Sequence, residues 1–380
     1  MPEFAIKPFD EPVYVTRPLC PPLPLIHEKL AEVWDARWLT NMGTQHKALE
    51  AELIRVLKVP YLSLFNNGTI ALMVACQSLR LSGEVITTPF TFAATPHVLA
   101  WHNIRPAFCD IDPVTMNIDA DRIENLITPQ TTAIMPVHVF GTPCDVEKIQ
   151  RIADRYGLKV IYDAAHAFGV EVNGVGIGNF GDISMVSFHA TKLFHTVEGG
   201  ALVYNDKNLK PRLDLMKNFG IQNESEVLMP GINGKLNEVQ AAIGLVVLSC
   251  VEEERAKREE MIAVYKECLA DVDGISFLPE LPHVKSNGQY MVVRFCEERF
   301  GKSRDEVYDK LREFNVFTRK YFYPLCSDFV CYRNLPSASE ANLPIARRVV
   351  EEVMSLPLYG ELGVEGAAKI SQIIRWIWKH

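Results

Sequence analysis

The chain has 380 residues, of which 39 are basic and 47 acidic, giving a net charge of -8, and 48% are hydrophobic. No basic run of the kind that follows a phosphate backbone is present, so we do not expect a nucleic-acid partner. The nine cysteines are scattered, without a C-x-x-C pair or histidines at zinc-like spacing, which favours reduced thiols and no metal site. The N-terminus lacks the apolar core of a secretion signal, and no run is long enough to span a membrane. We therefore expect a soluble, cytoplasmic protein.

The first elements surround a glycine turn. Apolar spacing and turn signals predict, in order, helices at 25–36 and 45–57, a strand at 61–65 and a helix at 70–81. Thr44 stands at the N-cap position of the second helix. Gly68 and Thr69 lie between the strand and the last helix, where free backbone N–H groups and the helix dipole favour an anion. The turn could hold a phosphate, and an ordinary capped turn fits the same residues.

The alternation of strands and helices continues along the chain. The β-rich runs are at 84–88, 106–110, 133–139, 159–163, 183–188 and 201–204. Such alternation predicts a mainly parallel sheet with helices on both faces. Ligands of these sheets bind at the carboxyl ends of the strands, which singles out Phe90, Phe92, His138, Asp163 and His166.

Asp163 follows the apolar residues 160–162. Burying a carboxylate there is costly unless a cation or hydrogen-bond donors meet it. A protonated pyridine nitrogen would serve, and Asp163 would then keep that ring an electron sink. The alternative is an aspartate that caps the next turn.

Lys192 lies on an irregular loop between the last two strands of the alternating part. Burial behind a strand disfavours the ammonium form and leaves the free amine that forms a Schiff base with a carbonyl. A solvated surface lysine is the alternative. The glycine run at 173–181 does not support a nicotinamide site, because it leads into a strand rather than opening a helix, and we expect a hairpin or loop there.

The C-terminal part has a different pattern. From residue 235 to about 269 there is no proline and one glycine, which predicts a single long helix, apolar at first and charged after Cys250. We place a boundary there, between a large cofactor-binding α/β domain (1–250) and a small α+β domain (251–380). The small domain is expected to contain strands at 290–295 and 316–318 and helices at 304–314, 344–353 and 365–378.

A Schiff-base lysine, a carboxylate, a phosphate-type turn and an aromatic residue after a strand are what pyridoxal phosphate requires. The segments that carry them resemble the DegT/DnrJ/EryC1/StrS sugar aminotransferases over nearly the whole chain. These segments are Asn67-Gly68-Thr69-Ile70-Ala71-Leu72, Asp163-Ala164-Ala165-His166, Ser187-Phe188-His189-Ala190-Thr191-Lys192, Glu198-Gly199-Gly200-Ala201, Gly231-Ile232-Asn233 and Asn237-Glu238-Val239-Gln240-Ala241-Ala242.

The resemblance implies an aspartate-aminotransferase type of fold (fold type I) and a homodimer with shared active sites. It also implies the residue roles: Lys192 for the Schiff base, Asp163 for the pyridine nitrogen, Gly68, Thr69 and Ser187 for the phosphate, Phe92 for stacking on the ring, and Asn233 for the phosphate of the partner subunit. His166 stands where many members carry glutamine near the phenolic oxygen. Lys235 replaces an arginine that is usual in its loop.

The favoured hypothesis for the function is transfer of an amino group from L-glutamate to C4 of dTDP-4-keto-6-deoxy-D-glucose. Alternatives are amination at C3, a UDP- or GDP-linked sugar, and a catalytically silent dimer that binds pyridoxal phosphate or a nucleotide. A related sugar dehydratase would carry histidine in place of Lys192. A protein of net charge -8 must gather cations locally to bind a nucleotide diphosphate, and Arg319 and Lys320 beside Tyr321 are the candidates, with a solvated pair as the alternative.

Overall fold

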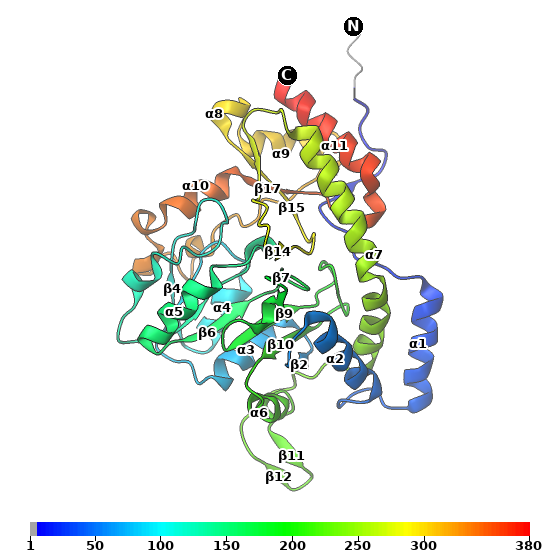
Figure 1. The fold of residues 1–380 in the computed structure, drawn as a ribbon, viewed down its shortest axis with the longest axis vertical. Coiled ribbons are helices and arrows are strands. Elements are labelled where there is room, and N and C mark those ends of the chain that lie inside the picture. Colours follow the sequence, from blue (N-terminus) through cyan, green and yellow to red (C-terminus); the bar gives the residue numbers. More distant parts are fainter. Residues whose placement is uncertain (1–5) are drawn as a thin grey trace.

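The central element of the computed structural model, which describes residues 6–380, is a seven-stranded sheet (Figure 1). Its strand order is β2 (Tyr61–Phe65), β10 (Gly200–Tyr204), β9 (Ile183–Ser187), β6 (Lys159–Asp163), β5 (Thr131–Met135), β3 (Glu84–Thr87) and β4 (Arg105–Phe108). Strand β10 runs antiparallel to both neighbours, and every other neighbouring pair is parallel. The mainly parallel sheet predicted from the alternation is confirmed.

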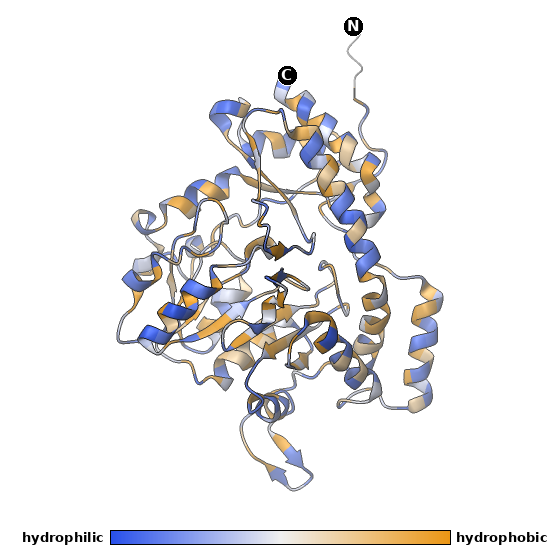
Figure 2. Cartoon of the chain, in the orientation of Figure 1, coloured by the Kyte–Doolittle hydropathy of each residue, from blue (hydrophilic) through white to orange (hydrophobic). Residues whose placement is uncertain are grey.

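Helices cover both faces of this sheet, as expected. They are α2 (Thr44–Leu57), α3 (Gly68–Ser78), α4 (Ala94–Trp101), α5 (Val146–Tyr156) and α6 (Leu209–Met216). Alternate side chains of β10 show the division: Ala201 and Val203 pack in the same core as α2, whereas Leu202 and Tyr204 pack in the core of α3. Because both faces are buried, the strands are mostly apolar, and Figure 2 draws most of them in orange.

The start of α2 differs from the sequence prediction. Gly43, not Thr44, is the N-cap residue. The cap is supplied by Glu238, whose buried carboxylate accepts the N–H groups of Gly43 at 2.8 Å and Gln45 at 2.7 Å. A carboxylate at this end also complements the helix dipole, so a distant acid replaces the local threonine.

The glycine run at 173–181 forms a hairpin, one of the two structures expected for it. Strand β7 (Glu171–Val172) pairs antiparallel with β8 (Val175–Gly176). Asn173 and Gly174 make the turn with φ of 51° and 78°, a left-handed backbone that asparagine and glycine tolerate best. Strand β14 (Val284–Lys285) extends this small sheet.

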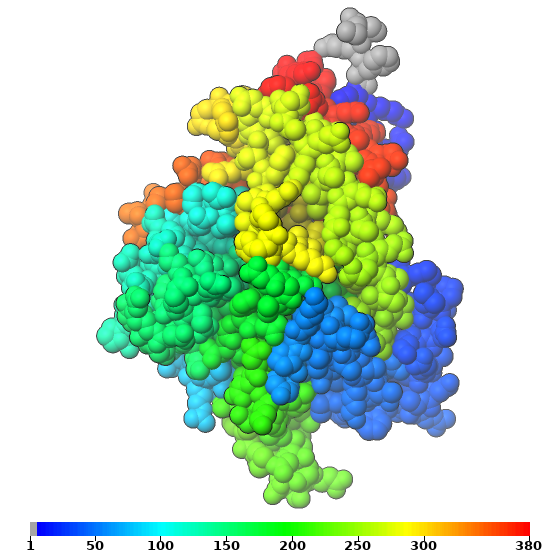
Figure 3. All heavy atoms as spheres, in the orientation of Figure 1, coloured from blue at the N-terminus to red at the C-terminus, as the bar shows by residue number. Residues whose placement is uncertain are grey.

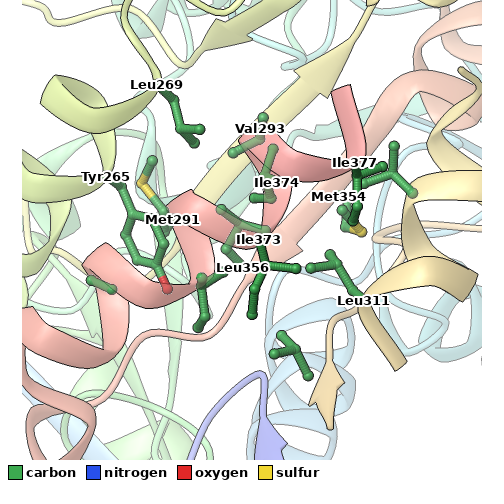
Figure 4. Packing of buried hydrophobic residues seen from close by; sticks show 14 of the residues in the cluster. Tyr265, Leu269, Met291, Val293, Leu311, Met354, Leu356, Ile373, Ile374 and Ile377 are labelled. Carbon is green, nitrogen blue, oxygen red and sulfur yellow. The ribbon is translucent and has the colours of Figure 1, made fainter. Parts of the chain in front are cut away.

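A long helix, α7 (Glu238–Leu269), crosses the molecule and confirms the prediction for this stretch. The side chain of Asn237 caps it by accepting the Gln240 N–H at 2.9 Å. Its first half packs in the core of α2, and its second half packs in a separate C-terminal core, to which Tyr265 and Leu269 belong (Figure 4).

The C-terminal core is built by α7 with a three-stranded antiparallel sheet and further helices. Its elements are β13 (Ile275–Phe277), β15 (Met291–Phe295), β17 (Val353–Leu356), α8 (Glu297–Phe300), α9 (Arg304–Glu313) and α11 (Gly363–Lys379), whereas α10 (Pro344–Glu352) packs in a neighbouring core with Phe90 and Val137. Near the N-terminus, β1 (Val13–Tyr14) pairs in parallel with β16 (Val316–Phe317), so this segment joins the C-terminal part before α1 (Leu23–Ala36) begins. The domain division at residue 250 remains a prediction.

Two further features concern the surface and the thiols. A hairpin of β11 (Ile221–Asn223) and β12 (Glu226–Val227) projects from the body of the molecule (Figures 1 and 3). The nine cysteines are all free thiols. Between residues 6 and 380, none of the helices is both long and apolar enough to cross a membrane.

Candidate active site

The glycine turn after β2 lies against the ends of β9 and β10. Gly200 pairs with Phe65 of β2 on one side and with Ser187 of β9 on the other. A side chain at Gly200 would come within 2.7 Å of the Gly68 nitrogen, and a side chain at Gly68 would lie 3.5 Å from Ser187 Oγ. The two glycines therefore permit the close approach of the turn. The structure brings the predicted Gly68 and Ser187 together.

Helix α3 begins in this turn. Its N-cap residue is Asn67, whose side-chain oxygen accepts the Ile70 N–H at 2.8 Å. The N–H groups of Gly68 and Thr69 precede the first intrahelical hydrogen bonds and have no helical partner. With the helix dipole and the Ser187 hydroxyl nearby, they form a cradle suited to a phosphate. The capped turn and the phosphate site, which the sequence left as alternatives, are compatible here.

Lys192 lies on the loop between β9 and β10 and is half-buried. Its N–H donates to the His189 carbonyl at 2.9 Å, and its Nζ lies 3.4 Å from the hydroxyl of Tyr290. Burial lowers the pKa of Lys192 to about 8, and the nearby Tyr321 and Asp163 oppose this only in part. Within the described part of the chain no carboxylate forms an ion pair with it. A larger share of neutral amine is therefore present than on a surface lysine.

Asp163 ends β6 and is only 4% exposed. Its Oδ2 accepts the hydroxyl hydrogen of Thr95 at 2.7 Å, and its Oδ1 accepts the Ala165 N–H at 3.0 Å. Burial raises the pKa of Asp163, and these hydrogen bonds and the charge of Lys192 offset part of that rise. The carboxylate thus caps the next turn as well, and both predicted roles use the same orientation.

His166 is held between aromatic rings. Its ring is nearly parallel to those of Phe140 and Phe322, at centroid distances of 6.4 and 5.6 Å, and meets Tyr290 edge-on at 5.1 Å. Its Nδ1 accepts the Phe140 N–H at 3.3 Å, so in the neutral ring the proton is on Nε2. Burial lowers the pKa of His166 well below its usual range. His166 is therefore a neutral donor through Nε2.

Phe92 and Asn233 both have exposed side chains. Phe92 is 65% exposed and lies one turn before Thr95, whose N–H donates to the Phe92 carbonyl at 3.2 Å. The Asn233 carbonyl accepts from the Asn66 side chain at 3.5 Å, beside the glycine turn of its own subunit. The predicted ring contact of Phe92 and partner-subunit contact of Asn233 remain predictions.

The stretch after β16 brings two of the three predicted substrate residues to the site. Arg319 forms an isolated antiparallel bridge with Ser355, so the backbone is extended there and successive side chains point to opposite sides. Tyr321 packs edge-on against Tyr290 at 5.9 Å. Burial raises the pKa of Tyr321, and the neighbouring Arg319 opposes that rise.

Lys320 points the other way. Its Nζ forms an ion pair with Asp305 at 2.7 Å and lies 4.4 Å from the centre of the Tyr308 ring. Asp305 and Tyr308 belong to α9, in the C-terminal core region. The structure thus does not bring Lys320 together with Arg319 and Tyr321, because strand alternation separates neighbouring residues.

Three residues that sequence reasoning missed contact the predicted ones. Thr95 donates a hydrogen bond to Asp163, and the hydroxyl of Tyr290 contacts the amine of Lys192. Gln289 forms hydrogen bonds with the backbone on both sides of that lysine. The spacing of Thr95 from Phe92 was a weak signal for the first. For Gln289 and Tyr290 the sequence offered none, because they lie almost a hundred residues from the lysine loop.

These residues fit pyridoxal phosphate. The buried Asp163 has no cationic side chain within ion-pair distance in the structure from residue 6 onward, and a protonated pyridine nitrogen would supply the positive charge. The cradle at Gly68 suits the phosphate, and the amine of Lys192 is poised for a carbonyl carbon. Comparison with known proteins then decides the family: the model of the DegT/DnrJ/EryC1/StrS aminotransferase family matches residues 25–375. The chain belongs to this family.

The chain is also similar to individual proteins named for dTDP-sugar chemistry and to a solved structure with a TDP-sugar product. It is 45% identical to the dTDP-4-amino-4,6-dideoxy-D-glucose transaminase of Escherichia coli, over 96% of this chain and 98% of that protein. It is also 45% identical to the transaminase of the same name from Shigella dysenteriae, over 97% and 100% of the two chains. The crystal structure of DesI in the presence of its TDP-sugar product matches with a TM-score of 0.93 and 35% identity, over 98% of this chain and 95% of that one.

Family membership confirms three expectations. The enzyme is a sugar aminotransferase, its cofactor is pyridoxal phosphate, and its fold is that of the related aminotransferases. The residues that hold the cofactor are assigned from the geometry above and remain our proposal.

Proposed function

We propose that this aminotransferase moves an amino group from L-glutamate to C4 of dTDP-4-keto-6-deoxy-D-glucose and so produces dTDP-4-amino-4,6-dideoxy-D-glucose. The observation that carries the chemistry is the position of Lys192 beside Asp163 and the glycine cradle. The choice of sugar is supported by the 45% identity to two transaminases that bear this name.

The residues of the chain then have defined tasks. When bound, pyridoxal phosphate supplies the electron sink that stabilises negative charge on the carbon next to the transferred nitrogen. Asp163, which accepts from Thr95, would hold a proton on the pyridine nitrogen, and His166, whose Nδ1 accepts the Phe140 N–H, would donate from Nε2 to the phenolic oxygen. Lys192 would attach the cofactor and, once displaced, would carry a proton at Nζ between the donor carbon and C4′ of the cofactor.

The sugar nucleotide is expected to meet the site beside Arg319 and Tyr321. Arg319 is exposed, and its charge is suited to a diphosphate on a protein of net charge -8. Tyr321 lies against Tyr290, which contacts Lys192, so a ligand on these side chains is within reach of the amine. We leave Lys320 out of this proposal because its ammonium is paired with Asp305.

We also propose a homodimer in which Asn233 reaches the partner's phosphate. The side chain of Asn233 is exposed, and the nearby projecting hairpin presents Val227, 67% exposed, and Leu228, 54% exposed. Exposed apolar side chains of this kind mark association surfaces. Mixing Lys192→Ala with Asn233→Ala subunits should restore activity through hybrid dimers, provided that the second variant alone is impaired. A fully active monomer in sedimentation would contradict the dimer.

The nine free thiols favour a reducing compartment, so we propose a cytoplasmic enzyme. Location of the tagged protein by fractionation tests this point.

The test of the reaction is a panel of 3-keto and 4-keto sugars linked to dTDP, UDP or GDP, each incubated with enzyme and glutamate. We expect turnover of the dTDP-4-keto sugar and an NMR coupling pattern that places the new amine at C4. An amine at C3, or turnover of GDP-sugars alone, would overturn the substrate and keep the aminotransferase. No reaction of the cofactor with any amino donor would favour the silent dimer.

A further inference from the structure

A loop segment in the C-terminal half, residues 287–290, reaches into the active site. We call these four residues the lysine clamp; they directly precede β15. Asn287 donates through Nδ2 to the carbonyls of His166 at 2.9 Å and Phe168 at 3.0 Å, and its Oδ1 accepts the Gln289 N–H at 3.0 Å. The clamp is therefore bonded to the segment that follows Asp163.

Gln289 bonds to the backbone on both sides of Lys192. Its Oε1 accepts the Leu193 N–H at 2.6 Å, and its Nε2 donates to the Thr191 carbonyl at 3.3 Å. Gln289 is buried, so these bonds form in surroundings with little competing water. One buried side chain from the other half of the chain thus bonds the lysine loop on both sides of Lys192.

Tyr290 completes the clamp at the amine itself. Its hydroxyl lies 3.4 Å from Lys192 Nζ, and its ring is wedged edge-on against Phe140, at 5.5 Å, and against His166, at 5.1 Å. Burial raises the pKa of Tyr290, so the phenol stays protonated and can both donate and accept a hydrogen bond.

A cavity lies beside the clamp. Gly288, Gln289 and Tyr290 border a cavity of about 530 Å³ between α7 and residues 277–292. In Figure 3 this is the region where the segment near residue 280 meets α7. Hydrogen bonds from Asn287 and Gln289, together with the ring contacts of Tyr290, hold the clamp against the lysine loop.

We propose that Tyr290 is a further catalytic residue, which binds the amine of Lys192 whenever that amine is not attached to the cofactor, and that Gln289 positions the lysine loop for this contact. The inference rests on the proposed aminotransferase reaction.

The proton balance of this step is simple. The free amine of Lys192 takes a proton from the donor carbon and becomes an ammonium, whose N–H donates to the Tyr290 oxygen. The ammonium would then pass the proton to C4′ of the cofactor, the carbon that keeps the transferred nitrogen, and the phenol keeps its own hydrogen throughout. A charge-assisted bond to the ammonium is stronger than the bond to the neutral amine, so Tyr290 favours the state that follows proton removal. Asp163, His166 and Tyr321 are the other titratable groups near this amine.

The test compares Tyr290→Phe with Tyr265→Phe. Tyr265 donates its hydroxyl to the Pro357 carbonyl at 3.0 Å in the C-terminal core, so the second variant also removes a buried hydroxyl but contacts no site residue. For each variant we would measure kcat and the sugar KM. In the cofactor-free protein we would measure the pH at which trinitrobenzenesulfonate labels Lys192 half-maximally, with the label mapped by mass spectrometry.

We expect Tyr290→Phe to lower kcat about tenfold, the equivalent of one hydrogen bond, and to leave the sugar KM unchanged. The pH of half-maximal labelling should fall by about one unit, because the ammonium loses an acceptor. Tyr265→Phe should change neither value. An unchanged kcat and labelling pH in Tyr290→Phe, or equal losses in both variants, would overturn the proposal.

Gln289→Leu tests the positioning part. It removes both bonds to the lysine loop with little change of volume, and we expect a lower kcat at an unchanged sugar KM, with the labelling pH shifted in the same direction. A parental kcat and labelling pH would refute the role of Gln289. If the parent enzyme did not turn over the dTDP sugar, the proposed substrate would fail, whereas the labelling of Lys192 would still decide the role of Tyr290.

Discussion

The carboxyl edge of the central sheet and the C-terminal half supply the site in different ways. At the sheet edge, register between neighbouring strands sets the positions of Asp163, Ser187 and Gly200. From the C-terminal half, single side chains such as Gln289 and Tyr290 reach across to the lysine loop. We infer that the sheet edge and its lysine loop hold the groups without which no reaction occurs, and that the other half assists them, Tyr290 at the amine and Gln289 by positioning the loop. Substitutions at the edge should then have the larger effects.

The largest effect is expected for Lys192→Ala. The variant should fold, because the side chain is only half-buried and forms no ion pair in the described structure, and should lose activity by at least about 10⁴-fold. Circular dichroism and steady-state kinetics check the two parts, with the exposed Lys207→Ala as a control of parental activity. Turnover above background in a homogeneous Lys192→Ala sample would place the reaction elsewhere.

Asp163→Asn should cause the second-largest loss of activity. An amide cannot hold the proton on the pyridine nitrogen, and loss of a charge-assisted hydrogen bond of about 1.5–3 kcal/mol corresponds to roughly 10- to 100-fold in kcat. Steady-state assays on the fully loaded variant measure this. Activity within twofold of the parent would show that Asp163 serves only as a cap.

Asp163→Asn should also change how the stability of the cofactor-free protein depends on pH. Because burial raises the folded-state pKa of Asp163 above the usual 3.8, the native state binds this proton more tightly than the unfolded chain. The contribution of Asp163 to stability is therefore fully present below pH 3.8 and is lost as pH rises through the folded-state pKa. Denaturant melts at a series of pH values in this window give the free energy of unfolding. As pH rises, this free energy should fall less for Asp163→Asn than for the parent. An equal dependence on pH in the two proteins would contradict the raised pKa.

Gly200→Ala should weaken the binding of pyridoxal phosphate without altering the catalytic groups. The new Cβ would lie 2.7 Å from the Gly68 nitrogen, and relieving such overpacking costs about 1–3 kcal/mol, or roughly 10- to 100-fold in the Kd of pyridoxal phosphate. Gly157→Ala, at an open helix end, is the control that should affect stability alone. Equal cofactor affinity in both variants would show that the cradle does not require Gly200.

The smallest effects on the kinetics are expected for two substitutions in the C-terminal half. Arg319→Ala should raise the KM for the sugar nucleotide about tenfold, as expected for one exposed charge-assisted contact, with little change in kcat. Lys320→Ala should change KM less, because its ammonium is paired with Asp305 on the opposite side of the strand. The reverse order of the two KM values would mean that the strand presents its other face to the substrate.

The two regions also differ in how far sequence predicts them. Strand periodicity and the glycine turn predicted β6, the carboxylate at its end and the loop of Lys192, because these depend on residues that are neighbours along the chain. The prediction of Thr44 as the N-cap of α2 was wrong, because the side chain that caps this helix, Glu238, lies 195 residues from Gly43. Gln289 and Tyr290 were missed for the same reason, since only the packing of the two halves brings them to Lys192. The prediction grouped Lys320 with Arg319 by adjacency, and the extended backbone separates them.

The account depends most on Lys192 being the residue that binds the cofactor. Reduction of the loaded enzyme with borohydride, followed by peptide mapping, tests this directly. We expect the reduced pyridoxyl group on Lys192 in nearly every chain, and no stable label in Lys192→Ala. A label on any other lysine of the parent enzyme would contradict the account.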